Sequence, residues 1–447
     1  MKHEFLSLVA GIAAVVGAAQ AASPAFTLEP IAGRPYAAGA VGTAGAPVYF
    51  PSGGTAGPDA PADMKAQSLQ TLARLKENLA TAGLSIDDVG YARAYLAPGP
   101  DGKIDYAGWE AAWQETFGAA AKPARSTVGV PFLGSPTTVV EVEFVALPAT
   151  SPGLFAASPD AQLPVTNDRL ALYGTRGGRI AGGIGVKPGT ALYFTAGTLA
   201  PTLDEKLKPA DRGYKGDMKT QARGTLLRLQ ENLASVGLSF KDVVYLRAFL
   251  APDVHLGGKF DYDGWNAAYG EFFNTAQLAH KPSRTTVTTP GFGDPATLIE
   301  IEIVAAFPAS PALFDAKSKT PQLRVYGAPT APIASGIAVA ATAPLYFSAG
   351  AVAMGDSVEA QATAALATLK ERMAAQGLGF EDVVFLRAYV VPGPDGNIDR
   401  AGWSAAYGRH FGTPQQPNKP ARTTIAVQSL PQPGYRIEID VVAARKP

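Results

Sequence analysis

The chain of 447 residues contains no cysteine and only four histidines. The absence of cysteine excludes disulfide bonds, thiolate nucleophiles and cysteine-ligated metals. The histidines occupy non-equivalent positions and form no metal-ligand pattern, so we expect no metal site. Stability must therefore come from a hydrophobic core, and 47% hydrophobic residues make such a core feasible.

The chain also has no excess of charge of either sign, with 38 basic and 38 acidic side chains. Phosphate binding depends on clustered lysine and arginine, and the sequence contains no basic stripe. We therefore expect no nucleic-acid partner.

Long apolar runs are absent after the first twenty residues. The N-terminal run from Phe5 to Ala19, followed by Ala19-Gln20-Ala21, predicts a secretory signal peptide cleaved after Ala21. The mature protein would then be secreted or periplasmic and free of the membrane. Glu4 is unusual before such a run, so an uncleaved N-terminal tether remains an alternative.

One motif, Lys-Pro-x-Arg followed by two hydroxyl residues, occurs three times. Its arginines are Arg125, Arg284 and Arg422. A glutamate follows each arginine after 16 positions, within an alternating segment, at Glu141, Glu300 and Glu438. We interpret this constant spacing as a hairpin that fixes one cation and one carboxylate relative to each other. A simple ion pair between two strands is the alternative interpretation.

The repeats divide the chain into a signal peptide and three units, with boundaries at 1–21, 22–150, 151–309 and 310–447. Each unit shows two short apolar strands, an amphipathic helix that ends at a glycine, a strand, a second helix and two final strands. In the last strand of unit 1, Val140 to Val145, carboxylates alternate with apolar residues. The pattern predicts α+β units with helices on one face of a sheet and a polar contact on the other.

Each unit also has an arginine in its third strand, namely Arg93, Arg247 and Arg387. We expect these arginines to pair with the second carboxylate of the last strand, which is Glu143, Glu302 or Asp440. A second cation for a substrate is the alternative role.

The ordered set of elements and motifs in each unit resembles the RidA (YjgF, L-PSP) family. That resemblance implies chorismate-mutase-like domains, which in the family assemble as homotrimers with clefts between subunits. Members hydrolyse reactive enamine and imine acids to 2-keto acids and ammonia without a cofactor. Three tandem copies therefore predict an intramolecular pseudo-trimer, a monomer that mimics the homotrimer.

The resemblance also assigns roles to residues. It implies that the three motif arginines bind a substrate carboxylate and that the three glutamates activate water. It places pocket glycines at Gly53, Gly197 and Gly350. The family's pocket tyrosine matches Tyr36, where the other units have Ile180 and Ile333, and its pocket asparagine matches Asn266, where the others have Glu110 and Ser404. No unit retains every family residue, so we expect one or two competent sites rather than three.

Two functions follow. The first is hydrolysis of small imine or enamine carboxylates. The second is binding of a carboxylate metabolite at the same arginines without turnover. The family's older ribonuclease activity is disfavoured by the neutral charge.

Overall fold

The structure is a computed structural model that describes residues 26–30, 37–57, 60–61, 63–118, 123–133, 135–148, 162–163, 167–173, 179–181, 183–203, 216–292, 296–308, 322–326, 334, 336–417 and 419–446. The predicted signal peptide and Tyr36 lie outside these residues, so both stay predictions. No helix in the described ranges is long and apolar enough to cross a membrane.

The described residues form three successive sets of strands and helices. Unit 1 contains β1 (Phe26–Pro30), β2 (Ala37–Gly42), β3 (Val48–Pro51), β4 (Gly54–Thr55), α1 (Met64–Thr81), β5 (Val89–Leu96), α2 (Tyr106–Phe117), β6 (Ala124–Gly129) and β7 (Val140–Ala146). Unit 2 contains β8 (Gln162–Leu163), β9 (Leu170–Tyr173), β10 (Gly183–Val186), β11 (Leu192–Thr195), α4 (Met218–Ser235), β12 (Val243–Leu250), α5 (Tyr262–Gly270), β13 (Ser283–Thr288) and β14 (Ile299–Ala306). Unit 3 contains β15 (Leu323–Tyr326), β16 (Gly336–Val339), β17 (Leu345–Ser348), α6 (Val358–Ala375), β18 (Val383–Val390), α7 (Arg400–Gly408), β19 (Ala421–Ala426) and β20 (Ile437–Ala444).

The first helix of each unit begins and ends at residues suited to those positions. In α1, the Asp63 carboxylate accepts the amide of Ala66 and so caps the N-terminus. The helix buries Leu72, Leu75 and Leu79 on one stripe. The glycines expected beyond these helices have positive φ, at 72° for Gly83, 79° for Gly237 and 69° for Gly377. This confirms the predicted helix ends, because a residue with a Cβ is strained in that conformation.

The strand order corrects one prediction. In unit 1, β5 lies between β6 and β7, parallel to β6 and antiparallel to β7. The same order holds for β13-β12-β14 and β19-β18-β20. The Arg strand and the Glu strand are therefore not neighbours, and the predicted hairpin is wrong. The connection between them is long enough for the chain to cross the third strand.

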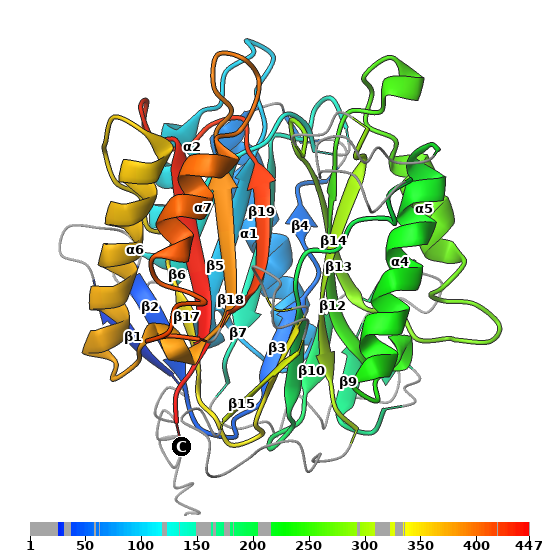
Figure 1. The fold of residues 1–447 in the computed structure, drawn as a ribbon. Coiled ribbons are helices and arrows are strands. Elements are labelled where there is room, and N and C mark those ends of the chain that lie inside the picture. Colours follow the sequence, from blue (N-terminus) through cyan, green and yellow to red (C-terminus); the bar gives the residue numbers. More distant parts are fainter. Residues whose placement is uncertain are drawn as a thin grey trace, which may run out of the picture.

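Each sheet has helices on one face, as the alternation predicted. In β7, Val142 and Phe144 pack in the same cluster as the α1 and α2 side chains. Glu141 and Glu143 lie on the opposite face and are also buried. Figure 1 shows α4 and α5 on one side of the molecule and α6 and α7 on the other, with strands between them. The carboxylate face of each sheet thus points into the protein.

The sheets of the three units are joined by strand pairing. Strand β3 of unit 1 pairs antiparallel with β10 of unit 2, and β11 of unit 2 pairs with β16 of unit 3. Strand β17 of unit 3 pairs with β2 of unit 1. Each unit therefore has backbone hydrogen bonds to both of the others.

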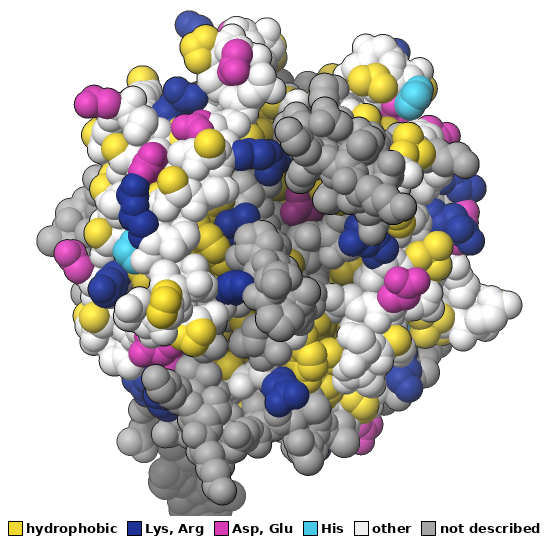
Figure 2. Space-filling view, viewed as in Figure 1, with side chains coloured by type: hydrophobic (Ala, Val, Ile, Leu, Met, Phe, Trp, Pro, Cys, Tyr) yellow, Lys and Arg dark blue, Asp and Glu magenta, His cyan; other side chains and the backbone are white. Residues whose placement is uncertain are grey.

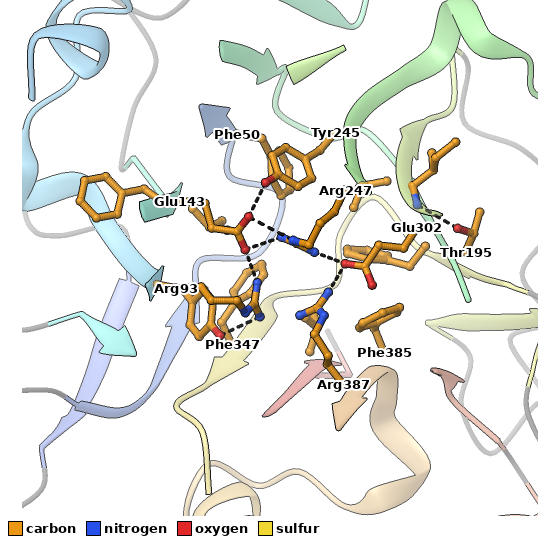
Figure 3. A pocket seen from close by; sticks show the side chains of 17 residues that line it. Phe50, Arg93, Glu143, Thr195, Tyr245, Arg247, Glu302, Phe347, Phe385 and Arg387 are labelled. Atoms are coloured by element: carbon orange, nitrogen blue, oxygen red, sulfur yellow. Dashed lines mark hydrogen bonds and ion pairs between the residues drawn. The ribbon is translucent and has the colours of Figure 1, made fainter. Parts of the chain in front are cut away.

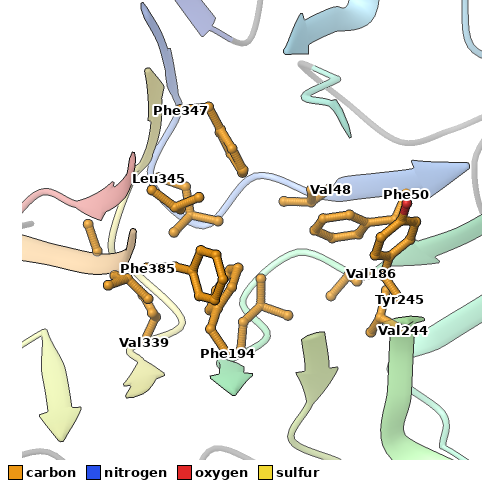
Figure 4. Packing of buried hydrophobic residues seen from close by; sticks show 14 of the residues in the cluster. Val48, Phe50, Val186, Phe194, Val244, Tyr245, Val339, Leu345, Phe347 and Phe385 are labelled. Carbon is orange, nitrogen blue, oxygen red and sulfur yellow. The ribbon is translucent and has the colours of Figure 1, made fainter. Parts of the chain in front are cut away.

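Two apolar clusters with residues from all three units occupy the space between the sheets. One includes Phe50 of β3, Phe194 of β11 and Phe347 of β17, which are labelled in Figure 4. The other includes Tyr95, Phe249 and Tyr389 from the third strands. Alternate residues of one strand face the same side, so Arg93 lies between Tyr91 of the first cluster and Tyr95 of the second.

The third-strand arginines form a closed ring of six ion pairs between these clusters. Arg93 pairs with Glu143, Arg247 with Glu302, and Arg387 with Asp440, which confirms the predicted partners. Each arginine also pairs with a carboxylate of another unit; these contacts are Arg93 with Asp440 at 3.0 Å, Arg247 with Glu143, and Arg387 with Glu302. Figure 3 shows most of this ring.

The ring is buried, and its charges compensate one another. Burial by itself would raise the pKa of Glu143, but Arg247 and Arg93 lower that pKa to about 2. The Tyr245 hydroxyl also donates to Glu143, and Thr423 donates to Glu302 at 2.7 Å. Such hydrogen bonds to the carboxylates offset part of the cost of burying the ion pairs, although Nε of Arg93 and of Arg387 has no partner among the described residues.

Candidate active sites between the units

The three motif arginines are held against the aromatic residues of the second helix in their own unit. The guanidinium carbon of Arg284 lies 5.4 Å from the ring centre of Trp265 and 4.6 Å from that of Tyr269. Arg422 stacks in the same way on Trp403 and Tyr407. Arg125 stacks on Trp109 and Trp113. Planar guanidinium groups favour such faces, which fix the arginine while leaving its edge for an anion.

Each arginine meets the glycine and glutamate of another unit rather than its own. The amide of Gly53 donates to the Arg284 carbonyl at 3.3 Å, that of Gly197 to Arg422 at 3.3 Å, and that of Gly350 to Arg125 at 3.2 Å. A Cβ at Gly53 would overlap the Glu141 carboxylate, and the same holds for Gly197 with Glu300 and Gly350 with Glu438.

Three sites result. We name them the 1–2 site, with Glu141 and Arg284; the 2–3 site, with Glu300 and Arg422; and the 3–1 site, with Glu438 and Arg125. The structure therefore brings together all the described candidates, in combinations that cross the unit boundaries.

The site glutamates have strongly raised pKa values. Burial raises the pKa of Glu141 to about 8, with Glu143 adding to the rise and Arg284 opposing it. Burial raises the pKa of Glu438 to about 8, with a contribution from Asp440. Burial raises that of Glu300 to about 7, against the opposing effect of Arg400 and Arg422. Carboxyl groups with such values can donate and accept a proton near neutral pH.

In the 1–2 site, the arginine is held by neutral partners. Arg284 Nη2 donates to the Asn266 side-chain oxygen at 2.9 Å. Its Nη1 is buried and has no hydrogen-bond partner among the described residues. Ser52 of unit 1 accepts the Arg284 amide at 2.8 Å and so fixes the backbone beneath the guanidinium. An unsatisfied buried N–H of a cation is a suitable position for a ligand carboxylate.

In the 3–1 site, the arginine already has a carboxylate partner. Arg125 Nη2 pairs with Glu110 at 2.7 Å, and the Glu110 side chain is 32% exposed. Glu110 occupies the position in the second helix of unit 1 that Asn266 occupies in unit 2. Unit 1 therefore has an anion where unit 2 has a neutral hydrogen-bond acceptor. A bound carboxylate would have to compete with Glu110 for Arg125.

The 2–3 site differs again. Ser404 stands at the position of Asn266, and within the described part of the chain Arg422 has no carboxylate at ion-pair distance. Burial lowers the pKa of Arg422, and the neighbouring cation Arg400 lowers it further.

Three residues, one in each unit, match the position of the family's pocket tyrosine, and of these only Ile180 lies within the described residues. It is half-buried and packs against the core of unit 2. Tyr36 and Ile333 lie outside the described ranges.

The sequence did not reveal that the aromatic residues of the second helices support the arginines; the three tryptophans are at the same time buried in the cores of their units. A signal was present, because each second helix has an aromatic residue four positions after its tryptophan, and residues at that spacing share a helix face. The described side chains contain no group of three or more histidine, aspartate or glutamate residues that could hold a metal ion.

The comparison with known families identifies these repeats. The family model described as Endoribonuclease L-PSP matches residues 27–148, 185–307 and 330–445. The chain belongs to this family, also known as RidA or YjgF. It contains three tandem copies of the L-PSP domain.

Solved structures of the same family resemble parts of the chain. A YjgF/YER057c/UK114 family member from Mycobacterium tuberculosis is 25% identical, covers 23% of this chain and 84% of its own, and has a TM-score of 0.20. A Rid family protein from Yersinia pestis is 24% identical over 28% of this chain and 98% of its own, with a TM-score of 0.25. E. coli TdcF with bound serine is 23% identical over 23% and 81%, with a TM-score of 0.21.

The family description mentions ribonuclease activity, which is said of the family and not of this chain. On the face in Figure 2, lysine and arginine side chains are interspersed with aspartate and glutamate.

Proposed function

We propose that this L-PSP protein hydrolyses small 2-imino and 2-enamino carboxylates to 2-keto acids and ammonia. One observation supports this most directly. A buried glutamate whose pKa is raised to about 8, Glu141, faces an arginine of the next unit whose Nη1 has no partner in the described part of the chain. A cation for the carboxylate and a carboxyl group for proton transfer are what the reaction needs.

The reaction follows from this geometry. The arginine binds the substrate carboxylate through two N–H groups, an arrangement that lysine does not provide. The neutral glutamate donates a proton to C3 of the enamine, which becomes an iminium ion. The resulting carboxylate accepts a proton from water as the water oxygen attacks C2. The glutamate then passes the proton taken from water to the nitrogen of the tetrahedral intermediate, and the C–N bond breaks to release ammonia. As the C2 carbonyl forms, the hydroxyl proton returns to the glutamate, which is neutral again.

The units would form an intramolecular pseudo-trimer, with each active site shared between two of them. Support comes from the strand pairs β3–β10, β11–β16 and β17–β2, each of which joins two units. The ion-pair ring is a second support, because each third-strand arginine in it bonds a carboxylate of another unit. Linked domains meet at high effective concentration, so a single chain can replace three subunits.

The sites would be unequal. The 1–2 and 2–3 sites have arginines without a carboxylate partner in the described ranges, whereas Arg125 of the 3–1 site pairs with Glu110. We therefore assign activity to the first two sites.

The test uses freshly generated 2-iminopropanoate, with keto-acid formation followed in the presence and absence of the protein. The wild-type chain should accelerate hydrolysis. The variant that combines Arg284→Ala and Arg422→Ala should lose the acceleration, whereas Arg409→Ala, which removes an exposed arginine paired with Glu359, should not. Equal rates with and without wild-type protein would overturn the proposal.

A non-catalytic carboxylate-binding role is the second candidate, because the buried arginines would serve it equally well. It predicts arginine-dependent binding of pyruvate without faster imine hydrolysis. The same variants distinguish the two functions.

A further inference from the structure

The first residue of the second helix occupies a boundary between two units in all three copies. These residues are Tyr106 of α2, Tyr262 of α5 and Arg400 of α7. The hydroxyl of Tyr106 lies 3.1 Å from that of Ser429 in unit 3. The ring of Tyr262 packs edge-on against Phe132 of unit 1, with 6.2 Å between ring centres. Arg400 Nη2 donates to the carbonyl of Phe292 in unit 2.

Each of these positions lies three residues before the tryptophan that stacks on a site arginine, and so on the same helix face, but only unit 3 places a charge there. Arg400 is the strongest opponent of the burial effect on the Glu300 pKa, and it also lowers the pKa of Arg422. The guanidinium groups of Arg400 and Arg422 therefore both favour the charged form of Glu300. The tyrosines of the other units add no positive charge at this point.

The 2–3 site consequently has more positive charge than its carboxylates compensate. Ser404 stands where unit 1 has Glu110, the carboxylate that neutralises Arg125 in the 3–1 site. Neither Arg422 nor Arg400 forms an ion pair with another described residue, while Glu302 is engaged with Arg247 and Arg387 in the ring. Arg400 is exposed, and among the described residues its side chain makes one hydrogen bond, to the Phe292 carbonyl, which leaves further N–H groups for a ligand.

We propose that the 2–3 site is selective for a 2-imino dicarboxylic acid, whose C1 carboxylate binds Arg422 and whose distal carboxylate binds Arg400. This inference rests on the proposed function and specifies the substrate class of one of its sites. Hydrolysis of the imine carbon would consume one water and release ammonia and a 2-keto dicarboxylate, as in the reaction above. The distal carboxylate takes no part in bond making.

The test measures binding of product-like probes by calorimetry in Arg284→Ala protein, so that the 1–2 site does not contribute. The probes are 2-oxoglutarate, with two carboxylates, and 2-oxobutanoate, with one. We expect 2-oxoglutarate to bind about tenfold more tightly, which corresponds to one additional charge-assisted contact. Adding Arg400→Tyr, the residue of units 1 and 2 at this position, should remove this preference and leave 2-oxobutanoate binding within about twofold.

Arg400→Lys should retain part of the preference, and Arg409→Ala at the C-terminal cap of the same helix should retain all of it. Equal affinity for the two probes, no measurable binding of 2-oxoglutarate, or an equal loss for both probes in Arg400→Tyr would overturn the inference. Selective binding without imine hydrolysis would refute the proposed function alone. Hydrolysis of 2-iminopropanoate without selectivity would refute this inference alone.

Discussion

Arg247 bonds two carboxylates from different units, Glu302 of its own unit and Glu143 of unit 1. All three side chains are buried, with exposed fractions of 8% for Arg247, 6% for Glu302 and 4% for Glu143. Arg247 thus connects the third and last strands of unit 2 and also connects unit 2 to unit 1.

Replacing Arg247 by alanine should strongly destabilise the protein. The change leaves two buried carboxylates without one of their cations, and breaking a buried pair typically costs about 3–5 kcal/mol of unfolding free energy. Denaturant unfolding should show this loss, while carboxylate affinity of the folded protein should stay nearly unchanged. The matched control is Arg223→Ala, which breaks an exposed pair with Glu271 and should cost less than about 1 kcal/mol. Equal stabilities of the two variants would contradict the structural role of the ring.

The site glutamates should make the protein less stable as pH rises. The pKa of Glu141 is about 8 in the folded protein against an ordinary 4.5, so the folded state binds more protons between these values. The unfolding free energy must then fall as pH rises from about 4.5 to about 8, by at most about 1.4 kcal/mol per pH unit for each such group. Glutamine cannot ionise, so Glu141→Gln should lose less stability than wild type between pH 6 and pH 9. An identical pH dependence of the two melting temperatures would argue against a buried neutral Glu141.

The ring carboxylates should have the opposite effect, so that the protein loses stability as pH falls and they become protonated. The pKa of Glu143 is lowered to about 2, so its contribution is complete above pH 4.5 and is lost as pH falls toward 2. Glu143→Gln should therefore be less stable than wild type at pH 7, and the difference should shrink on acidification. Thermal unfolding at pH 7 and pH 3 measures both values. A difference that grows toward pH 3 would be inconsistent with a charged Glu143.

Replacing Glu110 by asparagine should convert the 3–1 site into one that binds carboxylates. The change removes the anion that pairs with Arg125 and installs the residue that supports Arg284 in the 1–2 site. Titration with pyruvate should show one more bound ligand per chain than in wild type, or an affinity gain of about tenfold at a weak site. Glu115→Asn, which removes an exposed carboxylate on the same helix, serves as the control. No change in stoichiometry or affinity would show that Glu110 does not block the site.

Much of each unit could be predicted from sequence because the determining signals are local. Gly83 marks a helix end through its φ, and the alternation around Glu143 assigns faces within one strand. The pairing of Arg93 with Glu143 was also predictable, since both lie on one sheet face. Strand order was not, because the spacing between Arg125 and Glu141 does not show that β5 lies between them.

The composition of the sites was even less accessible from the sequence. The repeated motif suggests that Arg284 acts with Glu300, which has the same spacing in every unit. The structure instead places Arg284 near Glu141, because the carboxylate face of each sheet is covered by another unit. A contact between repeats leaves no mark in the spacing within a repeat. The closure of the ion-pair ring is hidden for the same reason.

The most direct test of sites shared between units compares two double variants in the hydrolysis of 2-iminopropanoate. Arg284→Ala with Glu141→Gln changes two units but only the 1–2 site, whereas Arg284→Ala with Glu300→Gln changes one unit but both active sites. Our account predicts that the first variant retains the activity of the 2–3 site, close to that of Arg284→Ala alone, and that the second loses nearly all activity. The reverse result, with activity retained only in the Arg284→Ala, Glu300→Gln variant, would show that each unit contains its own complete site and would contradict the account.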